Sequence, residues 1–398
     1  MTGWGGHGRK LWIPQAPTCP PVRAFLLVLL LAAYLPIWIG SADPWWRVKE
    51  WAVFVVGMGW VMARNLLPAK PARSSRDMGL TLLSAGLLLH FFLLFILPIV
   101  RAPDKLFQVP WPWMAMFHAL LVLAWLSDMR QMIRKEDITW IVRCMAWLGI
   151  LISAHMTLQW LKLDPLIWLV QRQFTSFKWL SENHMIGLMG NPFQAAAALA
   201  VLIPAIAYQK GRTWKIALLA SLFVCWTASS LSAFTAALVG SVLGLGILQT
   251  KKALIAFGIA CVLILLGMFV YDRAILLDPG RLQIWTQAWA HIQRHPILGV
   301  GLNQFKLLGI HQTPNVMYEV RWAHNEWVHF ATELGILWAA GLAAYLLLQA
   351  KKLFLISPAL FGCFASILLL SFLHIPFHLA PTLAVAGICL SATHLKGA

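Results

Sequence analysis

The chain has 398 residues, of which 60% are hydrophobic and 11% are charged, and its mean hydropathy is +0.73. These values exclude an ordinary soluble domain and indicate an integral membrane protein. The formal net charge of +17 would suit a nucleic-acid-binding protein, but the Lys and Arg residues stand in short loops between apolar runs. That distribution sets the orientation of a membrane protein and does not form a groove for nucleic acid.

The chain opens with a polar lead and continues as a series of apolar runs. Residues 1–21 are rich in proline and basic side chains, so we expect a cytoplasmic N-terminal lead, and we predict that the first span is an uncleaved anchor. The apolar runs predict about twelve membrane-spanning helices. They lie at residues 22–39, 51–67, 79–100, 111–127, 138–158, 191–209, 214–228, 230–249, 253–271, 325–348, 353–373 and 376–394.

We therefore predict an all-α, polytopic membrane fold in which residues 22–398 form one domain. Clusters of Lys and Arg occur in alternate loops, which places both termini in the cytoplasm. Residues 159–190 and 272–324 are too long for simple turns and fall on the outer side. Their mixture of apolar and basic side chains predicts amphipathic helices that lie along the membrane surface.

The second outer segment contains a well-marked helix. Asp278 can cap a helix that begins at Pro279, and Pro296 ends it. Its expected apolar face consists of Leu282, Trp285, Trp289 and Ile292. Arg281 lies in the first turn, where unpaired backbone N–H groups and the helix dipole favour an anion. The position predicts either a clamp for a diphosphate or an ordinary interfacial arginine.

Several kinds of chemistry lack the residues they need. No predicted span has a central Asp or Glu, which argues against a carboxylate-driven transporter. The sequence has no Asp-x-Asp pair, no Walker-type loop, no Gly-x-Ser-x-Gly elbow and no His-Glu-x-x-His pair. Its six cysteines have no paired spacing. We expect no metal and no cofactor.

Arginine, histidine and amide side chains remain on the outer side. His324 opens a predicted span directly after the long outer segment, so it is either a base for a hydroxyl group or a polar residue at a helix entrance. His329 and Glu333 lie four residues apart and can bond to each other. Trp285 can stack on a carbohydrate or belong to the aromatic belt of the membrane interface. Arginine and histidine together suit transfer of a group from a phosphate-activated lipid to an alcohol.

Two stretches, RLQIWTQAWAHIQRHPILGVGLNQF from Arg281 and AHNEWVHFATELGI from Ala323, together resemble the paired motifs of the O-antigen ligase and polymerase family. The residues that carry the resemblance are Arg281, Trp285, Ala288, Pro296, Gly299, Gly301, Phe305, His324, Asn325, Glu333 and Gly335. A weaker likeness covers residues 187–204. The resemblance implies a GT-C-like helical enzyme of the bacterial inner membrane, with its catalytic domain at residues 22–398 and its active site facing the periplasm.

The family implies transfer of a glycan from undecaprenyl diphosphate to an acceptor hydroxyl without a metal. It implies that Arg281 engages the diphosphate and that His324 activates the acceptor or steadies the reacting centre. We predict further substrate-binding residues at Asn325, Arg321, Arg172, Asn303 and Trp285.

The chain departs from the family at one position. Family members carry Ser-Arg-Gly or a similar triplet at the head of an earlier span, whereas this chain has Ser229-Ser230-Leu231-Ser232 there. Either Arg172, Arg273 or Arg321 replaces the missing arginine, or the donor site differs. The predicted reaction is ligation to lipid A-core in lipopolysaccharide biosynthesis. Alternatives are the O-antigen polymerase, a protein O-oligosaccharyltransferase and, from another class, a flippase for lipid-linked glycan.

Overall fold

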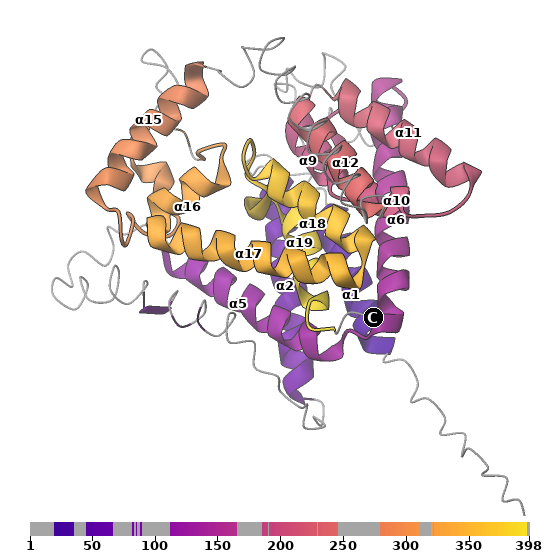
Figure 1. Cartoon of the computed structure of the whole chain (residues 1–398), viewed down its shortest axis with the longest axis horizontal. Coiled ribbons are helices and arrows are strands. Elements are labelled where there is room, and N and C mark those ends of the chain that lie inside the picture. The colour runs from indigo at the N-terminus through magenta and orange to yellow at the C-terminus, as the bar shows by residue number, and fades with distance from the viewer. Residues whose placement is uncertain are drawn as a thin grey trace, which may run out of the picture.

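The structure is a computed structural model, and every regular element that it describes is a helix (Figure 1). It describes residues 20–35, 45–66, 112–164, 185–189, 191–228, 230–245, 279–310, 320 and 322–395, with four single positions between 82 and 89. Within these ranges the predicted all-α class is confirmed. The spans predicted at 79–100 and 253–271 and most of the outer segment 159–190 fall outside the described residues.

The described helices follow the chain from Pro20 to Ala392. In chain order they are α1 (Pro20–Tyr34), α2 (Trp45–Leu66), α5 (Pro112–Met132), α6 (Lys135–Trp160), η3 (Gly187–Met189), α9 (Pro192–Ala200), α10 (Ile203–Ala207), α11 (Arg212–Thr227), α12 (Leu231–Gly244), α15 (Pro279–Arg294), η5 (Phe305–Leu307), α16 (Glu326–Leu334), α17 (Ile336–Ile356), α18 (Pro358–Leu370), η6 (Pro376–His378) and α19 (Ala380–Ala392).

Two of the described helices, α6 and α17, are long and apolar enough to cross a membrane. The shorter apolar helices run over Val22–Tyr34, Pro192–Ala207, Leu231–Gly244, Pro358–Leu370 and Ala380–Ala392. The total of about twelve spans stays a prediction.

Helix starts are set by local side chains. Asn191 accepts hydrogen bonds from the backbone N–H groups of Phe193 and Gln194 at the start of α9, with a proline at the first position. Ser357 does the same for α18 through the N–H of Leu360, again with a proline following it. A side-chain acceptor with proline behind it is a strong signal for a helix start. The caps therefore fix where the chain enters these helices.

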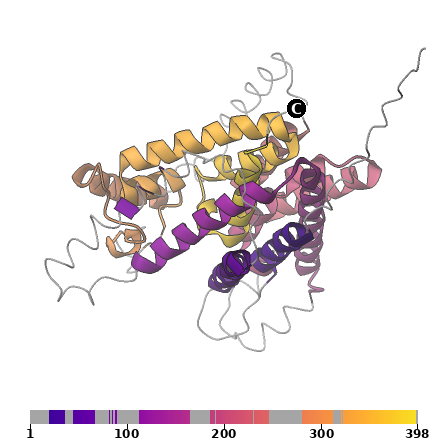
Figure 2. The ribbon, with the colours of Figure 1, turned by 90° about the horizontal axis from the view of Figure 1, so that it is seen from below.

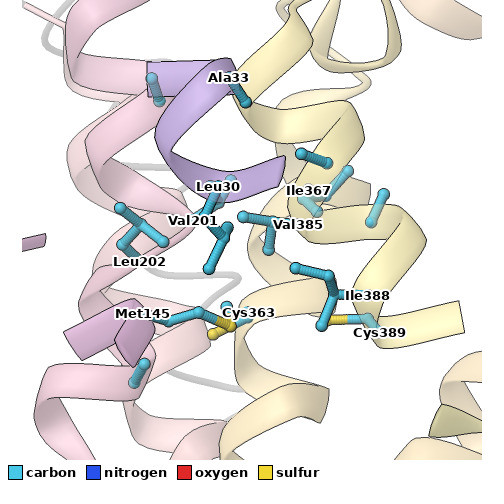
Figure 3. Packing of buried hydrophobic residues seen from close by; sticks show 14 of the residues in the cluster. Leu30, Ala33, Met145, Val201, Leu202, Cys363, Ile367, Val385, Ile388 and Cys389 are labelled. Carbon is cyan, nitrogen blue, oxygen red and sulfur yellow. The ribbon is translucent and has the colours of Figure 1, made fainter. Parts of the chain in front are cut away.

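Small and medium apolar side chains fill the central core, which Figure 3 shows from close by. Leu30 of α1, Met145 of α6 and Cys363 of α18 are fully or almost fully buried there. Val201 and Val385 pack between these helices. Cys363, together with Cys144, Cys225 and Cys389, is a free thiol.

Glycine and serine bring α12 and α18 into close contact. A Cβ atom added at Gly362 would collide with the Gly240 carbonyl oxygen and lie 2.8 Å from the Cα of Gly244. The hydroxyl of Ser366 donates to the carbonyl of Ala236 across the contact at 2.9 Å. Small residues let helix backbones approach closely, which is how helices associate in a membrane.

The structure breaks the span predicted at 325–348 into two helices. α16 ends at Leu334, Gly335 has φ +87°, and α17 begins at Ile336. A Cβ atom at Gly335 would collide with the carbonyl group of Ile297, so the backbone turns away from the helix path where it meets this loop. The prediction of one continuous span was wrong. The apolar run continues across Gly335, so the sequence pattern does not show the break.

α15 begins at Pro279 and ends at Arg294, as predicted, and the predicted apolar face is confirmed only in part. Ile292 is buried and Trp285 packs on the protein, together with Ile284 and Ala288, whereas Leu282 and Trp289 are exposed. Both sets recur at helical spacing. The first set contacts the protein and the second faces away from it, and sequence periodicity does not separate the two.

α15 and α16 lie together at the N-terminal end of α17, on the opposite side of the molecule from α11 (Figure 1). Seen from below, the orange residues again gather at one end of the long orange-to-yellow helix, while α11 lies at the other end (Figure 2). This end of the molecule contains Arg281 and His324.

Candidate active site

Arg281 lies in the first turn of α15, as predicted from the sequence. Its Nη1 atom donates to the carbonyl oxygen of Leu373 at 3.4 Å, and its side chain is partly exposed. Leu373 belongs to the connection between α18 and α19. The bond brings the helix start, with its unpaired N–H groups, against a segment 92 residues further along the chain.

Trp285 ties α15 to the approach of α16. Its Nε1 atom donates to the carbonyl oxygen of Ala323 at 2.7 Å. Its ring packs on a small core that contains Ile284, Phe305 and Ala323. The geometry assigns Trp285 a role in positioning His324, which follows Ala323 directly.

The loop after α15 is bonded to the end of α16. The N–H of Val300 donates to the carbonyl of Thr332 at 2.9 Å, and the N–H of Gly301 donates to the carbonyl of Glu333 at 2.9 Å. Gly299 has φ +65°, and a Cβ atom there would collide with the carbonyl group of Glu333. Only glycine allows this approach at that dihedral angle.

The carboxylate of Glu333 fixes the same loop. It accepts from the N–H of Asn303 at 2.8 Å and from the N–H of Phe305 at 3.0 Å. Burial raises the pKa of Glu333, and the N–H of Phe305 opposes that rise. The ring of His329 lies 3.5 Å from the carboxylate, as expected from their spacing. Glu333 is therefore an anchor for the loop, and Asn303 is held there by its backbone.

The backbone is held on either side of His324, by the Trp285–Ala323 bond before it and by Asn325 after it. Asn325 accepts from the N–H groups of Trp327 and Val328, at 3.0 and 3.1 Å, and so caps α16. His324 itself has φ +52°, in the left-handed region that non-glycine residues seldom adopt. Strain of this kind persists only where the surroundings impose it, and it gathers at functional sites. Asn325, predicted to bind substrate, is occupied as a helix cap.

The connection between α18 and α19 completes the site and was missed in the sequence. The N–H of Glu326 donates to the carbonyl of Ser371 at 2.8 Å. The carboxylate of Glu326 accepts from the N–H of Phe377 at 2.6 Å and lies 2.9 Å from Nδ1 of His378. A signal was present, because His374 and His378 flank Pro376 between two apolar runs on the predicted outer side.

Burial and nearby positive charges lower the pKa of two histidines in the site. Burial, together with the charges of Arg281 and His324, lowers the pKa of His374 to about 3. Burial, then the charges of His378 and His324, lowers the pKa of His329 well below its usual value. Because both Arg281 and His324 act on His374, the three side chains share one electrostatic environment. An anion is the ligand that such an environment favours.

Some predicted site residues are not brought together here. Arg172, Arg321 and Arg273 lie outside the described residues, as does Ser229. Ser230 caps α12 by accepting from the N–H of Ala233 at 3.4 Å. The head of α12 therefore supplies a hydroxyl cap where the family has an arginine, and the replacement for that arginine stays a prediction.

The described part of the chain holds no group of three or more His, Cys, Asp or Glu side chains that could bind a metal ion. The site contains a guanidinium, the start of a helix and several imidazoles. They surround the loop after α15, which the Glu333 carboxylate holds by hydrogen bonds. These groups can bind an anion and move a proton.

One family model covers the part of the chain that contains Arg281 and His324. No curated protein matches the chain. Residues 216–346 match a family model described as O-antigen ligase, and this segment spans α11, α12, α15, α16 and half of α17. It contains Arg281, Trp285, Asn303, His324 and Glu333. O-antigen ligases are membrane-embedded, in keeping with the apolar composition. Over this segment, which is about a third of the chain, the protein is similar to the O-antigen ligase family.

Proposed function

We propose that the protein is a metal-independent glycosyltransferase that transfers a glycan from undecaprenyl diphosphate to an acceptor hydroxyl. The acceptor we propose is lipid A-core, in the assembly of lipopolysaccharide. The enzyme lies in the bacterial inner membrane with its site toward the periplasm. The observation that carries the proposal is that Arg281 and His324, both within the family-matched segment, each act on the connection between α18 and α19. Arg281 bonds to Leu373 there, and both side chains lower the pKa of His374.

Arg281 has the role of diphosphate ligand in this proposal. Its guanidinium offers a fork of N–H donors that suits phosphate oxygens, and it stands in the first turn of α15, where backbone N–H groups add positive charge. A diphosphate leaving group gains negative charge as the sugar–oxygen bond breaks. Fixed positive groups at that point lower the barrier without any metal ion.

His324 activates the acceptor or steadies the reacting centre. His324 and Arg281 act on the same residue. Burial is the main cause of the lowered pKa of His374, and the charges of Arg281 and His324 lower it further. Its strained backbone is held between the Trp285–Ala323 bond and the Asn325 cap. A group fixed in this way is preorganised for the reaction, with little reorganisation needed. Arg321, Arg172, Asn303 and Trp285 are proposed to line the donor or acceptor path.

The test is a transfer reaction with purified full-length protein, undecaprenyl-diphosphate-linked glycan and lipid A-core, in the presence of EDTA. We expect a new glycosidic product and released undecaprenyl diphosphate. Product with a second carrier-linked glycan alone would indicate a polymerase, and product with a pilin alone a protein oligosaccharyltransferase. Failure with every acceptor, or strict dependence on a divalent ion, would contradict the proposal. Movement of carrier-linked glycan across liposomes without a new bond would indicate a flippase.

A further inference from the structure

Glu326 is a fully buried carboxylate in the first turn of α16, and it has two defined partners. One oxygen accepts from the N–H of Phe377 at 2.6 Å, and the other lies 2.9 Å from Nδ1 of His378. A buried carboxylate is tolerated when it is hydrogen-bonded, and the helix start favours its negative charge. Glu326 lies within the second motif stretch but is not one of the residues that carry the resemblance, and His378 lies outside both stretches.

The contact sets the tautomer of His378. An ionised carboxylate can only accept, so Nδ1 of the imidazole carries the proton that it donates to Glu326. Nε2 is then the basic nitrogen of the neutral ring, on a side chain that is 22% exposed. A carboxylate behind a histidine also stabilises the imidazolium that forms when the ring takes a proton.

Aromatic rings fix the plane of His378. The ring of Trp322 meets it edge-on, with centroids 4.7 Å apart, and the ring of Phe330 stacks at 5.9 Å. His329 lies 4.6 Å away at an interplanar angle of 85°. The backbone is fixed as well, because the hydroxyl of Thr382 in α19 donates to the carbonyl of Pro376, two residues before His378. An imidazole held on all these sides keeps one orientation.

His324 and His378 differ in what surrounds them. His324 and Arg281 both act as positive charges on His374, and such an environment favours binding of a diphosphate. His378 has a carboxylate at its back, which favours uptake of a proton. The two histidines therefore suit different tasks in one reaction.

Resting on the proposed function, we propose that His378 takes the proton from the acceptor hydroxyl, with Glu326 as its positioning residue. The hydroxyl proton passes to Nε2 as the hydroxyl oxygen forms a bond to the anomeric carbon of the glycan. The bond from that carbon to the diphosphate oxygen breaks, and its electron pair leaves with undecaprenyl diphosphate beside Arg281 and His324. The imidazolium then gives its proton to water, which restores the neutral ring.

The test compares His378→Gln with wild type in full-length protein, using undecaprenyl-diphosphate-linked glycan as donor and lipid A-core as acceptor. We expect kcat to fall by about 100-fold or more, the usual contribution of a general base. Binding of undecaprenyl diphosphate should change by less than about threefold, because the variant removes a step of the reaction and leaves the donor contacts in place. His295→Gln, an exposed histidine just after α15, is the matched control and should transfer normally.

Glu326 is tested with two variants that separate orientation from folding. In Glu326→Gln the amide can still accept from the N–H of Phe377, but its NH2 group donates to Nδ1 and moves the ring proton to Nε2. We expect a loss of about 100-fold or more. Glu326→Asp keeps a carboxylate and should retain at least about tenfold more activity than the Gln variant. A purely structural role would be served by Gln as well as by Asp.

Transfer by His378→Gln within about threefold of wild type would overturn the inference, and so would equal activity of the Gln and Asp variants at Glu326. If His378→Gln does not yield monodisperse protein, the two Glu326 variants decide the question by themselves. These outcomes leave the proposed function intact as long as wild-type protein makes product. Absence of product from wild type would instead contradict the proposed function itself.

Discussion

The α12–α18 contact and the outer site are stabilised in different ways. In the first, Gly240, Gly244 and Gly362 remove side chains so that two helices pack backbone to backbone. In the second, the buried carboxylates of Glu333 and Glu326 bind backbone N–H groups of loops far away in the sequence. The helix contact depends on residues without side chains, and the outer site depends on a few hydrogen bonds to buried carboxylates.

We therefore expect substitutions in the two regions to lower different quantities. A packed helix contact stabilises the whole bundle, so a change there should lower stability first. The outer site orders segments that contribute little to the core, so a change there should lower turnover first.

The largest effect is expected at Arg281 and His324. Arg281→Ala and His324→Ala should each lower kcat by about 100-fold or more, because each removes a preorganised group at the reacting centre. The thermal unfolding midpoint should stay close to that of wild type. Turnover and thermal unfolding are measured on the same preparations, and Arg294→Ala, at the exposed far end of α15, is the control. Near-normal turnover in both site variants would refute this assignment.

Two glycine variants compare the regions directly. Gly362→Ala inserts a methyl group into the α12–α18 contact and should destabilise the bundle by about 1–3 kcal/mol or more. Gly335→Ala places a side chain at φ +87° against Ile297 and should mainly reduce turnover. Thermal unfolding and transfer are measured for each. Gly341→Ala, which meets nothing within 4 Å, should change neither. Equal loss of stability in both variants would remove the distinction between the regions.

Removing the Glu333 carboxylate should give a smaller and mixed effect. Glu333→Ala leaves the N–H groups of Asn303 and Phe305 without their acceptor, which costs about 1–3 kcal/mol for a buried group. Limited proteolysis should show cleavage within residues 296–310, together with reduced transfer. Glu136→Ala, an exposed carboxylate in the first turn of α6, is the control. An unchanged digestion pattern would contradict the anchoring role.

The smallest effect concerns acid stability. His374 has its pKa lowered from 6.5 to about 3 by burial, so below pH 6.5 the unfolded chain binds a proton that the folded chain does not. Stability from this group is complete above pH 6.5 and falls as the pH drops, by at most about 1.4 kcal/mol per pH unit. His374→Gln should therefore lose less thermal stability than wild type between about pH 7.5 and about pH 5. Parallel losses would show that other groups set the acid sensitivity.

The sequence predicted those parts of the site that local signals define. Pro279 and Pro296 bound α15, and Arg281 falls in its first turn as expected. The exposed and buried faces of α15 were not separable, because both contain apolar residues at helical spacing. The break at Gly335 was hidden by a continuous apolar run, since it depends on a collision with Ile297.

Contacts between distant segments could not be predicted from one sequence. His378 bonds to a residue 52 positions earlier, and Arg281 bonds to one 92 positions later. Neither contact is signalled by a periodic pattern in the sequence, because both depend on how α18 and α19 pack against α16. The histidines around Pro376 were visible as residues but not as neighbours of Arg281.

A structure of the full-length protein with bound undecaprenyl diphosphate would show whether Arg281 and His324 hold the diphosphate. We expect density for the diphosphate at the start of α15, with phosphate oxygens about 3 Å from the guanidinium of Arg281 and with His324 beside them. Density for the diphosphate away from both side chains would contradict it.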